Sequence, residues 1–120
     1  MRDYTELASF EREGFLVIVD KSWEDLALRH CFDDSCYDIE DMERKVDSCE
    51  LDWFMLRVRV LFDGHEFGSH YLGGCLYEDA KDVLTDGTAE DCIAEALHEA
   101  RGEVRRLKEK LNSINLEETV

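Results

Sequence analysis

Cysteine and histidine are the residues of this chain best suited to binding a metal. The chain has five cysteines and four histidines, namely Cys31, Cys36, Cys49, Cys75, Cys92, His30, His65, His70 and His98. Zinc prefers these ligands, usually as two close pairs that complete a set of four. Cys31 and Cys36 are separated by four residues, and no second close pair completes the set. We therefore expect most of these thiols to be small buried side chains, and we expect no metal or other cofactor.

Nucleophilic catalysis requires a cysteine or serine beside a base. His30 and Cys31 are neighbours in the sequence, but adjacent residues of a helix point in different directions. Cys75 follows Gly73 and Gly74, and the strand pattern described below places it on the core side of a sheet. We find no catalytic motif and predict a protein that is not an enzyme.

The most distinctive polar stretch is acidic. Six carboxylates are candidates for partner binding: Asp33, Asp34, Asp38, Glu40, Asp41 and Glu43. A calcium loop would need a central glycine and a glutamate at its twelfth position, and both are missing here. Two interpretations stay open, a solvated surface and a binding patch. Carboxylates spaced like DNA phosphates could occupy a groove that normally holds DNA, with an affinity that falls as salt is added.

Composition sets wider limits. The 120 residues contain 30 acids and 14 bases, a net charge of −16, and 44% are hydrophobic. This length and hydrophobic content predict one domain over residues 1–120. The charge argues against direct binding of nucleic acid or of an anionic membrane, although acidity can also serve solubility alone. A polar N-terminus and an odd number of cysteines favour the cytoplasm.

The clearest local structure lies between residues 53 and 77. Apolar residues alternate along 53–62, Asp63-Gly64 favours a two-residue turn, and a second strand follows in which Gly73-Gly74 predicts a bulge. A simple register pairs Val60 with Phe67, Leu56 with Tyr71, Arg59 with Gly68 and Arg57 with His70. We also expect Trp23, Trp53, Met55 and Leu72 on the sheet face opposite the core, either covered by N-terminal helices or exposed as a contact patch.

Helices are predicted on both sides of this hairpin. Thr5 and the Ser22–Asp25 segment resemble helix starts and predict short helices over 5–12 and from 22 to about 31, with an apolar segment or strand at 15–19 between them. Asp38 could cap a helix over 39–48. A helical piece is expected at 78–84, and Thr88 should cap a long amphipathic helix over 89–111. Residues 111–120 are predicted to form a frayed tail. The fold class is therefore α+β, with an antiparallel sheet against a long C-terminal helix.

In size, acidity and lack of a catalytic signature the chain resembles the small phage-encoded inhibitors of bacterial defence, which include anti-CRISPR proteins and DNA-mimicking anti-restriction proteins. The resemblance implies an acidic α+β protein that blocks a basic nucleic-acid-binding surface of a defence complex in the bacterial cytoplasm. Two alternatives stay open. One is a dimeric structural or assembly protein that pairs through its long helix or sheet face, and the other is a small cysteine-dependent metal or redox module.

Overall fold

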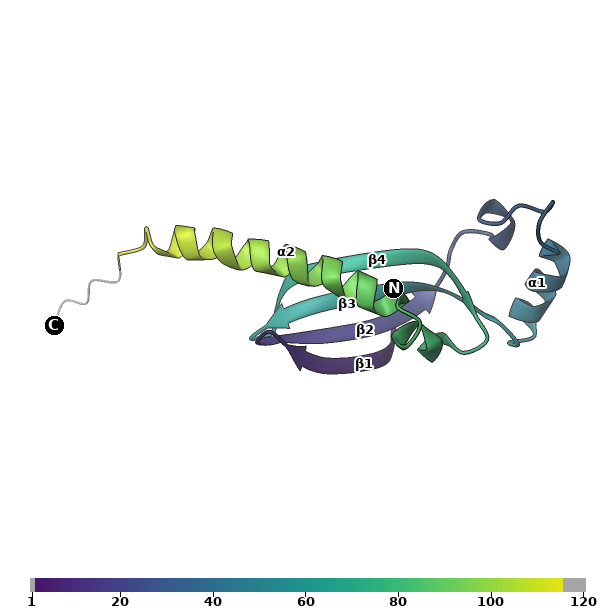
Figure 1. The fold of residues 1–120 in the computed structure, drawn as a ribbon, viewed down its shortest axis with the longest axis horizontal. Helices are drawn as coiled ribbons and strands as arrows, with labels where there is room; N and C mark the ends of the chain where they lie inside the picture. The colour runs from purple at the N-terminus through teal and green to yellow at the C-terminus, as the bar shows by residue number, and fades with distance from the viewer. Residues whose placement is uncertain (1, 116–120) are drawn as a thin grey trace.

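The computed structural model describes residues 2–115 of the chain. Four strands form one antiparallel sheet in the order of the sequence, and a long helix, α2 (Thr88–Leu111), packs along one face (Figure 1). The strands are β1 (Thr5–Arg12), β2 (Phe15–Trp23), β3 (Asp52–Phe62) and β4 (His65–Tyr77). The α+β class and the packing of the sheet against the C-terminal helix are confirmed.

The hydrophobic core lies between the sheet and α2. Alternate residues of the two central strands point into it, and all of them are almost completely buried: Val17, Val19, Phe54, Leu56, Val58 and Val60. The helix contributes Ile93, Ala96, Leu97 and Ala100. Full burial of a side chain such as valine or leucine stabilises a fold by about 1.5–3 kcal/mol, so this layer is the main source of stability.

Both hairpins turn through two residues with positive φ. Asp63 and Gly64 have φ angles of 51° and 78°, which confirms the predicted tight turn between β3 and β4. Glu13 and Gly14 do the same between β1 and β2, with φ angles of 55° and 86°. Gly14 therefore belongs to the tight turn between two strands.

The predicted helix over residues 5–12 is wrong, because this segment is strand β1. It pairs with β2 from Thr5 opposite Lys21 to Arg12 opposite Phe15. Strand β2 satisfies the backbone groups on one side of β1, and Leu7 and Phe10 pack against the edge of the core.

The predicted helix from residue 22 is also wrong. Ser22 and Trp23 end β2, opposite Met55 and Phe54, and only a 3-10 turn, η1 (Leu28–His30), follows. The Glu24 carboxylate does not cap a helix. It accepts hydrogen bonds from the backbone N–H groups of Gly74 at 2.8 Å and Leu26 at 3.2 Å. This carboxylate therefore links the end of β2 to β4.

The register of the second hairpin differs by one residue from the simple pattern. Val60 pairs with Gly68, Leu56 with Leu72, Arg59 with Ser69 and Arg57 with Tyr71. The shift arises at an irregularity between Val60 and Leu61, which leaves Phe67 without a direct partner. A second irregularity lies between Phe54 and Leu56, opposite the predicted Gly73-Gly74 bulge.

Gly68 gives the physical reason for this shift. A Cβ atom at this position would lie 2.2 Å from the carbonyl oxygen of Ala96 and 2.8 Å from the backbone nitrogen of Ala100. Only a glycine allows α2 to approach the sheet this closely, so Gly68 must face the helix.

The remaining helices follow the predictions more closely. Helix α1 (Ile39–Asp47) is capped by Asp38, whose side chain accepts from the Asp41 N–H, and a 3-10 turn, η2 (Ala80–Leu84), follows β4. The N-cap of α2 is Gly87 and not Thr88. The carboxylate of Asp86 accepts from the Thr88 N–H at 2.9 Å, and the Thr88 hydroxyl lies 3.0 Å from the Tyr77 hydroxyl.

The C-terminal half of α2 extends past the hairpin turns (Figure 1). Leu111 ends the helix and therefore does not belong to a frayed tail, and residues 112–115 form a turn and a bend. The rest of the predicted tail, 116–120, lies outside the described residues. No helix between residues 2 and 115 is long and apolar enough to cross a membrane.

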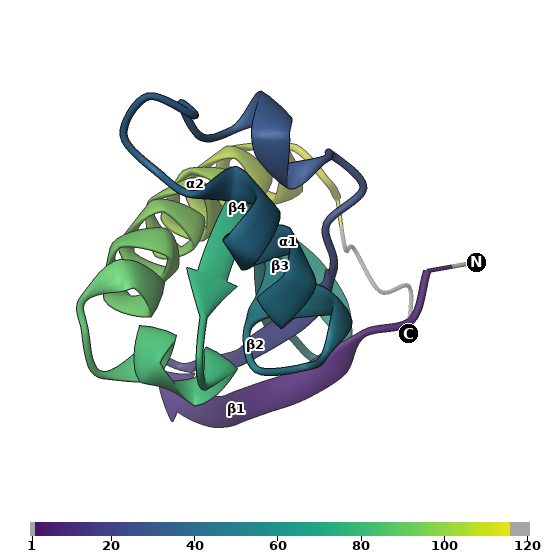
Figure 2. The same cartoon turned by 90° about the vertical axis from the view of Figure 1, so that its right-hand side faces the viewer.

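The four apolar residues predicted on the face opposite the core divide between both faces. Trp23 pairs with Phe54 and Leu72 pairs with Leu56, so both lie on the side that α2 covers. Trp53 and Met55 alternate with those core residues and lie on the open face. Within residues 2–115 no helix covers this face, and the segment between β2 and β3, which contains α1, lies at the end of the sheet (Figures 1 and 2).

Candidate functional site

The candidate site is the segment that joins β2 to β3, residues 24–51, which we call the acidic lobe. It contains ten acids and three bases, a net charge of −7. Its two regular elements are η1 and α1, which lie beyond one end of the sheet (Figure 1). All six predicted carboxylates belong to the lobe.

A tryptophan of β3 anchors the lobe to the sheet. The indole N–H of Trp53 donates to the carbonyl oxygen of Leu26 at 2.9 Å, and the ring of Phe32 packs 5.9 Å from that of Trp53. Phe32 also meets Tyr37 edge to face at 5.1 Å. Leu28 and Ile39 are the buried apolar residues of the lobe, and both lie outside the main core. The lobe therefore has a small cluster of its own.

Two of the six predicted carboxylates accept hydrogen bonds from nearby backbone N–H groups and so stabilise the local backbone. Asp38 accepts from the Asp41 N–H at 3.1 Å and caps α1. Asp33 accepts from the Ser35 N–H at 2.9 Å, and hydrogen bonds from the Ser35 backbone and side chain lower the pKa of Asp33. Both groups are exposed, but their orientation is set by these bonds.

Two more are paired with bases of the lobe. Asp41 forms ion pairs with Arg44 and with Lys45, the second at 3.3 Å, and Glu43 pairs with Arg29. Asp34 and Glu40 remain, and neither forms a hydrogen bond or ion pair with another residue of 2–115. These two carboxylates are free to pair with a partner.

Four of the six carboxylates surround one surface pocket of about 730 Å³. Asp33, Asp34, Asp38 and Glu40 line it together with Arg29, His30, Phe32, Tyr37 and Ile39. Asp41 and Glu43 lie outside this lining. Sequence reasoning missed Arg29 and Tyr37, although Tyr37 is half exposed and an aromatic residue among carboxylates is a usual sign of a contact site.

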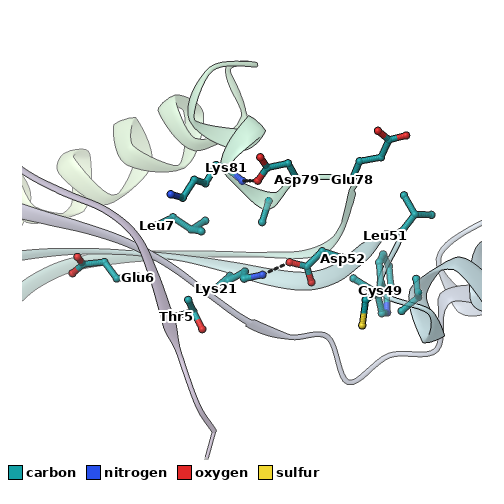
Figure 3. A pocket seen from close by; sticks show the side chains of 13 residues that line it. Thr5, Glu6, Leu7, Lys21, Cys49, Leu51, Asp52, Glu78, Asp79 and Lys81 are labelled. Atoms are coloured by element: carbon teal, nitrogen blue, oxygen red, sulfur yellow. Dashed lines mark hydrogen bonds and ion pairs between the residues drawn. The ribbon is translucent and has the colours of Figure 1, made fainter.

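A second pocket, of about 710 Å³, lies where the lobe meets the sheet and η2 (Figure 3). Lys21 and Asp52 form an ion pair in it, and Asp79 accepts from the Lys81 N–H at 3.0 Å. Cys49 is the one thiol in the lining, and no hydrogen bond joins it to a base among the described residues. Among the described residues, Lys21 and Asp52 are the only charged groups of this lining that form an ion pair with each other.

The cysteines divide into two groups. Cys31, Cys36 and Cys49 are exposed and belong to the lobe, so the expectation that most thiols are buried is wrong. Cys75 and Cys92 are buried, as the strand pattern predicted for Cys75. Burial raises the pKa of both thiols, that of Cys75 to about 11. Within residues 2–115, no three His, Cys, Asp or Glu side chains gather as a possible metal site.

The open face of the sheet carries the opposite charge at its centre. Arg57 donates to both oxygens of Asp20, at 2.8 and 2.6 Å, and Arg59 approaches the same carboxylate at 3.5 Å. The Arg57 guanidinium also stacks 3.4 Å from the ring of Tyr4. Two guanidinium groups share one carboxylate, so this face does not extend the acidic site.

Comparison with known proteins adds no relative. The chain matches no protein family, no curated protein and no solved structure.

Proposed function

We propose that the chain is a non-enzymatic binding protein whose acidic lobe engages a basic nucleic-acid-binding surface of another protein. A bacterial defence complex is the target that the resemblance to small phage inhibitors implies. The observation that carries the proposal is the separation of charge along the molecule. The lobe has a net charge of −7 and lies at one end, away from the end reached by the basic part of α2.

This separation preserves the negative potential of the lobe. Five bases, Arg101, Arg105, Arg106, Lys108 and Lys110, lie in the C-terminal half of α2, at the other end of the molecule (Figure 1). At this distance, beyond a Debye length of about 8 Å in physiological salt, they do not neutralise the lobe. A basic groove would therefore be attracted to the lobe and oriented toward it.

The carboxylates of the lobe differ in how readily they can pair with a cationic side chain of the partner. Asp34 and Glu40 can accept an arginine or lysine of the partner without losing an existing bond. Asp41 and Glu43 would first have to give up Arg44, Lys45 or Arg29. Tyr37 lines the same pocket and supplies apolar contact area. We assign the principal contacts to Asp34, Glu40 and Tyr37, with Asp33 and Asp38 beside them.

The test is affinity capture from bacterial lysate at low and at high salt, with the whole chain as bait and partners identified by mass spectrometry. We expect a nucleic-acid-binding protein that is retained at low salt and released at high salt. Asp34→Asn combined with Glu40→Gln should weaken its binding about tenfold, or about 1.4 kcal/mol. DNA added to the purified complex should compete with the chain.

The matched control removes the same charge elsewhere. Glu99→Gln with Glu109→Gln changes two exposed glutamates of α2 that form no ion pair in the described part of the chain. This variant should bind like the unmodified protein. Equal loss of binding in both variants would show that only total charge matters, and capture of no nucleic-acid-handling protein at either salt would contradict the proposal.

A further inference from the structure

The apolar residues of α2 follow a strict heptad pattern beyond the point where the sheet covers them. Steps of four and three residues alternate without a break through six residues of the helix, Ile93, Leu97, Ala100, Val104, Leu107 and Leu111, and Ile114 in the bend after the helix continues the spacing. This is the spacing of the a and d positions in a helix pair. The first three residues are buried against the chain's own sheet.

We call this row of apolar residues the seam, and its C-terminal part is not covered by the sheet. Val104 and Leu107 are partly buried, whereas Leu111 is 57% and Ile114 54% exposed. Leu107 and Leu111 line an apolar groove of about 360 Å³ together with aromatic side chains at the hairpin ends. These are Phe15, Phe62 and Phe67, whose rings pack on each other at 6.1–6.2 Å. Phe62 is itself 55% exposed.

Charges of both signs border the groove. Glu13 and Lys108 belong to its lining, and Asp63 and Lys110 are the sequence neighbours of the lining residues Phe62 and Leu111. Glu13 pairs with Arg101 at 3.0 Å. Asp63, Lys108 and Lys110 form no ion pair with another residue of the described chain. The surface therefore combines apolar residues with a carboxylate and amines that form no ion pair among the described residues.

We propose that a second copy of this chain occupies the groove, with the C-terminal ends of the two α2 helices packed antiparallel. A two-fold interface uses the same surface from both partners, so that surface must be complementary to itself. This surface carries both the groove and the apolar helix residues that would fill it, and it carries charges of both signs. In the antiparallel arrangement Leu111 and Ile114 of one copy lie over Val104 and the phenylalanines of the other. Lys110 of one copy then approaches Asp63 of the other.

The orientation follows from where each sheet ends. Up to Ala100 the seam faces the chain's own sheet. In a parallel pair the two seams would face each other along their whole length, so both sheets would have to fit between the helices. Antiparallel helices would place the two sheets at opposite ends of the pair, because α2 extends past the hairpin turns in each copy. The overlap is short, which predicts a weak dimer with a dissociation constant in roughly the micromolar range.

The test is sedimentation equilibrium of the whole chain over a range of concentrations. We expect the apparent mass to rise from 14.0 kDa toward twice that value. Leu111→Glu should weaken association at least about tenfold, because it buries a charge in the seam. Phe62→Ser should have the same effect from the sheet side. Both residues are more than half exposed, so the melting temperature of the monomer should not change.

Leu26→Glu is the matched control, because Leu26 is 56% exposed but lies in the acidic lobe. This variant should dimerise normally. Zero-length crosslinking of a mixture of isotopically heavy and light chains should join Lys110 of one chain to Asp63 of the other. A monomer at every concentration, or a dimer that Leu111→Glu does not weaken, would overturn the proposal. Either result would leave the binding role of the acidic lobe untouched, since the two surfaces lie at opposite ends.

Discussion

Arg57 holds Asp20 in a two-pronged ion pair across β2 and β3, on the sheet face that α2 does not cover. The two residues are direct neighbours in the ladder, and Asp20 is only 3% exposed. The hydrogen bond from Arg57 to Asp20 is the main reason that the pKa of the Arg57 guanidinium is raised. A charged pair is thus buried although the face is open, because Tyr4 and Arg59 screen it from water.

Removing one member of this pair should be costly. Asp20→Ala leaves Arg57 and Arg59 facing each other without the carboxylate, and loss of one partner of a buried pair typically costs about 3–5 kcal/mol. We expect a loss of about 3 kcal/mol in the free energy of unfolding, measured by urea denaturation. Asp52→Asn is the control, because the Lys21–Asp52 pair is more exposed and should contribute less than about 1 kcal/mol. Similar losses in both variants would contradict this account.

The close approach of α2 to β4 depends on Gly68. Gly68→Ala would place a Cβ atom 2.2 Å from the Ala96 carbonyl oxygen, so the helix must shift away from the sheet. We expect a loss of about 3 kcal/mol in the free energy of unfolding. Gly102→Ala is the matched control, since nothing lies within 4 Å of its Cβ position. That change should stabilise the protein by about 0.5–1 kcal/mol, because alanine favours the helix.

The buried thiol of Cys75 predicts sensitivity to alkali. Burial, and then the neighbouring Cys92, raise the pKa of Cys75 from its ordinary 9.0 to about 11. The folded pKa is the higher one, so the stabilisation is complete below pH 9 and is lost as the pH rises toward 11. Thermal unfolding measured across this window should show a falling melting temperature. The fall should be smaller in Cys75→Ala and unchanged in Cys31→Ala, which alters an exposed thiol.

Trp53 should control the order of the acidic lobe more than the stability of the sheet. Trp53→Ala removes the hydrogen bond to Leu26 and the ring contact with Phe32. We expect hydrogen exchange of the amides of η1 and α1 to accelerate at least about tenfold, with little change in β2 and β3. Trp23→Ala is the control, because the Trp23 indole donates to Asp25 at the lobe boundary, stacks with Arg2 and contacts neither η1 nor α1 through a hydrogen bond among the described residues. Slow exchange in the Trp53 variant would show that the lobe is held in another way.

The elements with a strong local signal could be predicted from the sequence. The alternation along β3, the Asp63-Gly64 turn and the long apolar stripe of α2 each indicated the observed structure. Strand β1 could not be predicted in this way, because only its pairing with β2 makes it a strand. Its sequence suits a helix equally well, because Thr5 is a possible helix cap and is followed by an acid and by Leu7.

The acidic site was only partly accessible to sequence reasoning. The cluster of carboxylates was visible, but their pairing was not. Arg29 lies fourteen residues before Glu43, and nothing in the spacing indicates that they meet. The register of β4 was missed for a similar reason, since the need for a glycine at residue 68 comes from the backbone of α2, which is distant in the sequence.

The acidic lobe replaces what could be a two-residue turn. Strands β2 and β3 are antiparallel neighbours, and the other two connections of the sheet are tight turns. The lobe keeps its buried residues apart from the main core, and it is fastened to the rest of the chain by a few contacts, through Trp53, Gly74 and Arg2. Its sequence can therefore change without endangering the scaffold, so that the sheet and α2 should still fold when this one insertion is exchanged for a short turn.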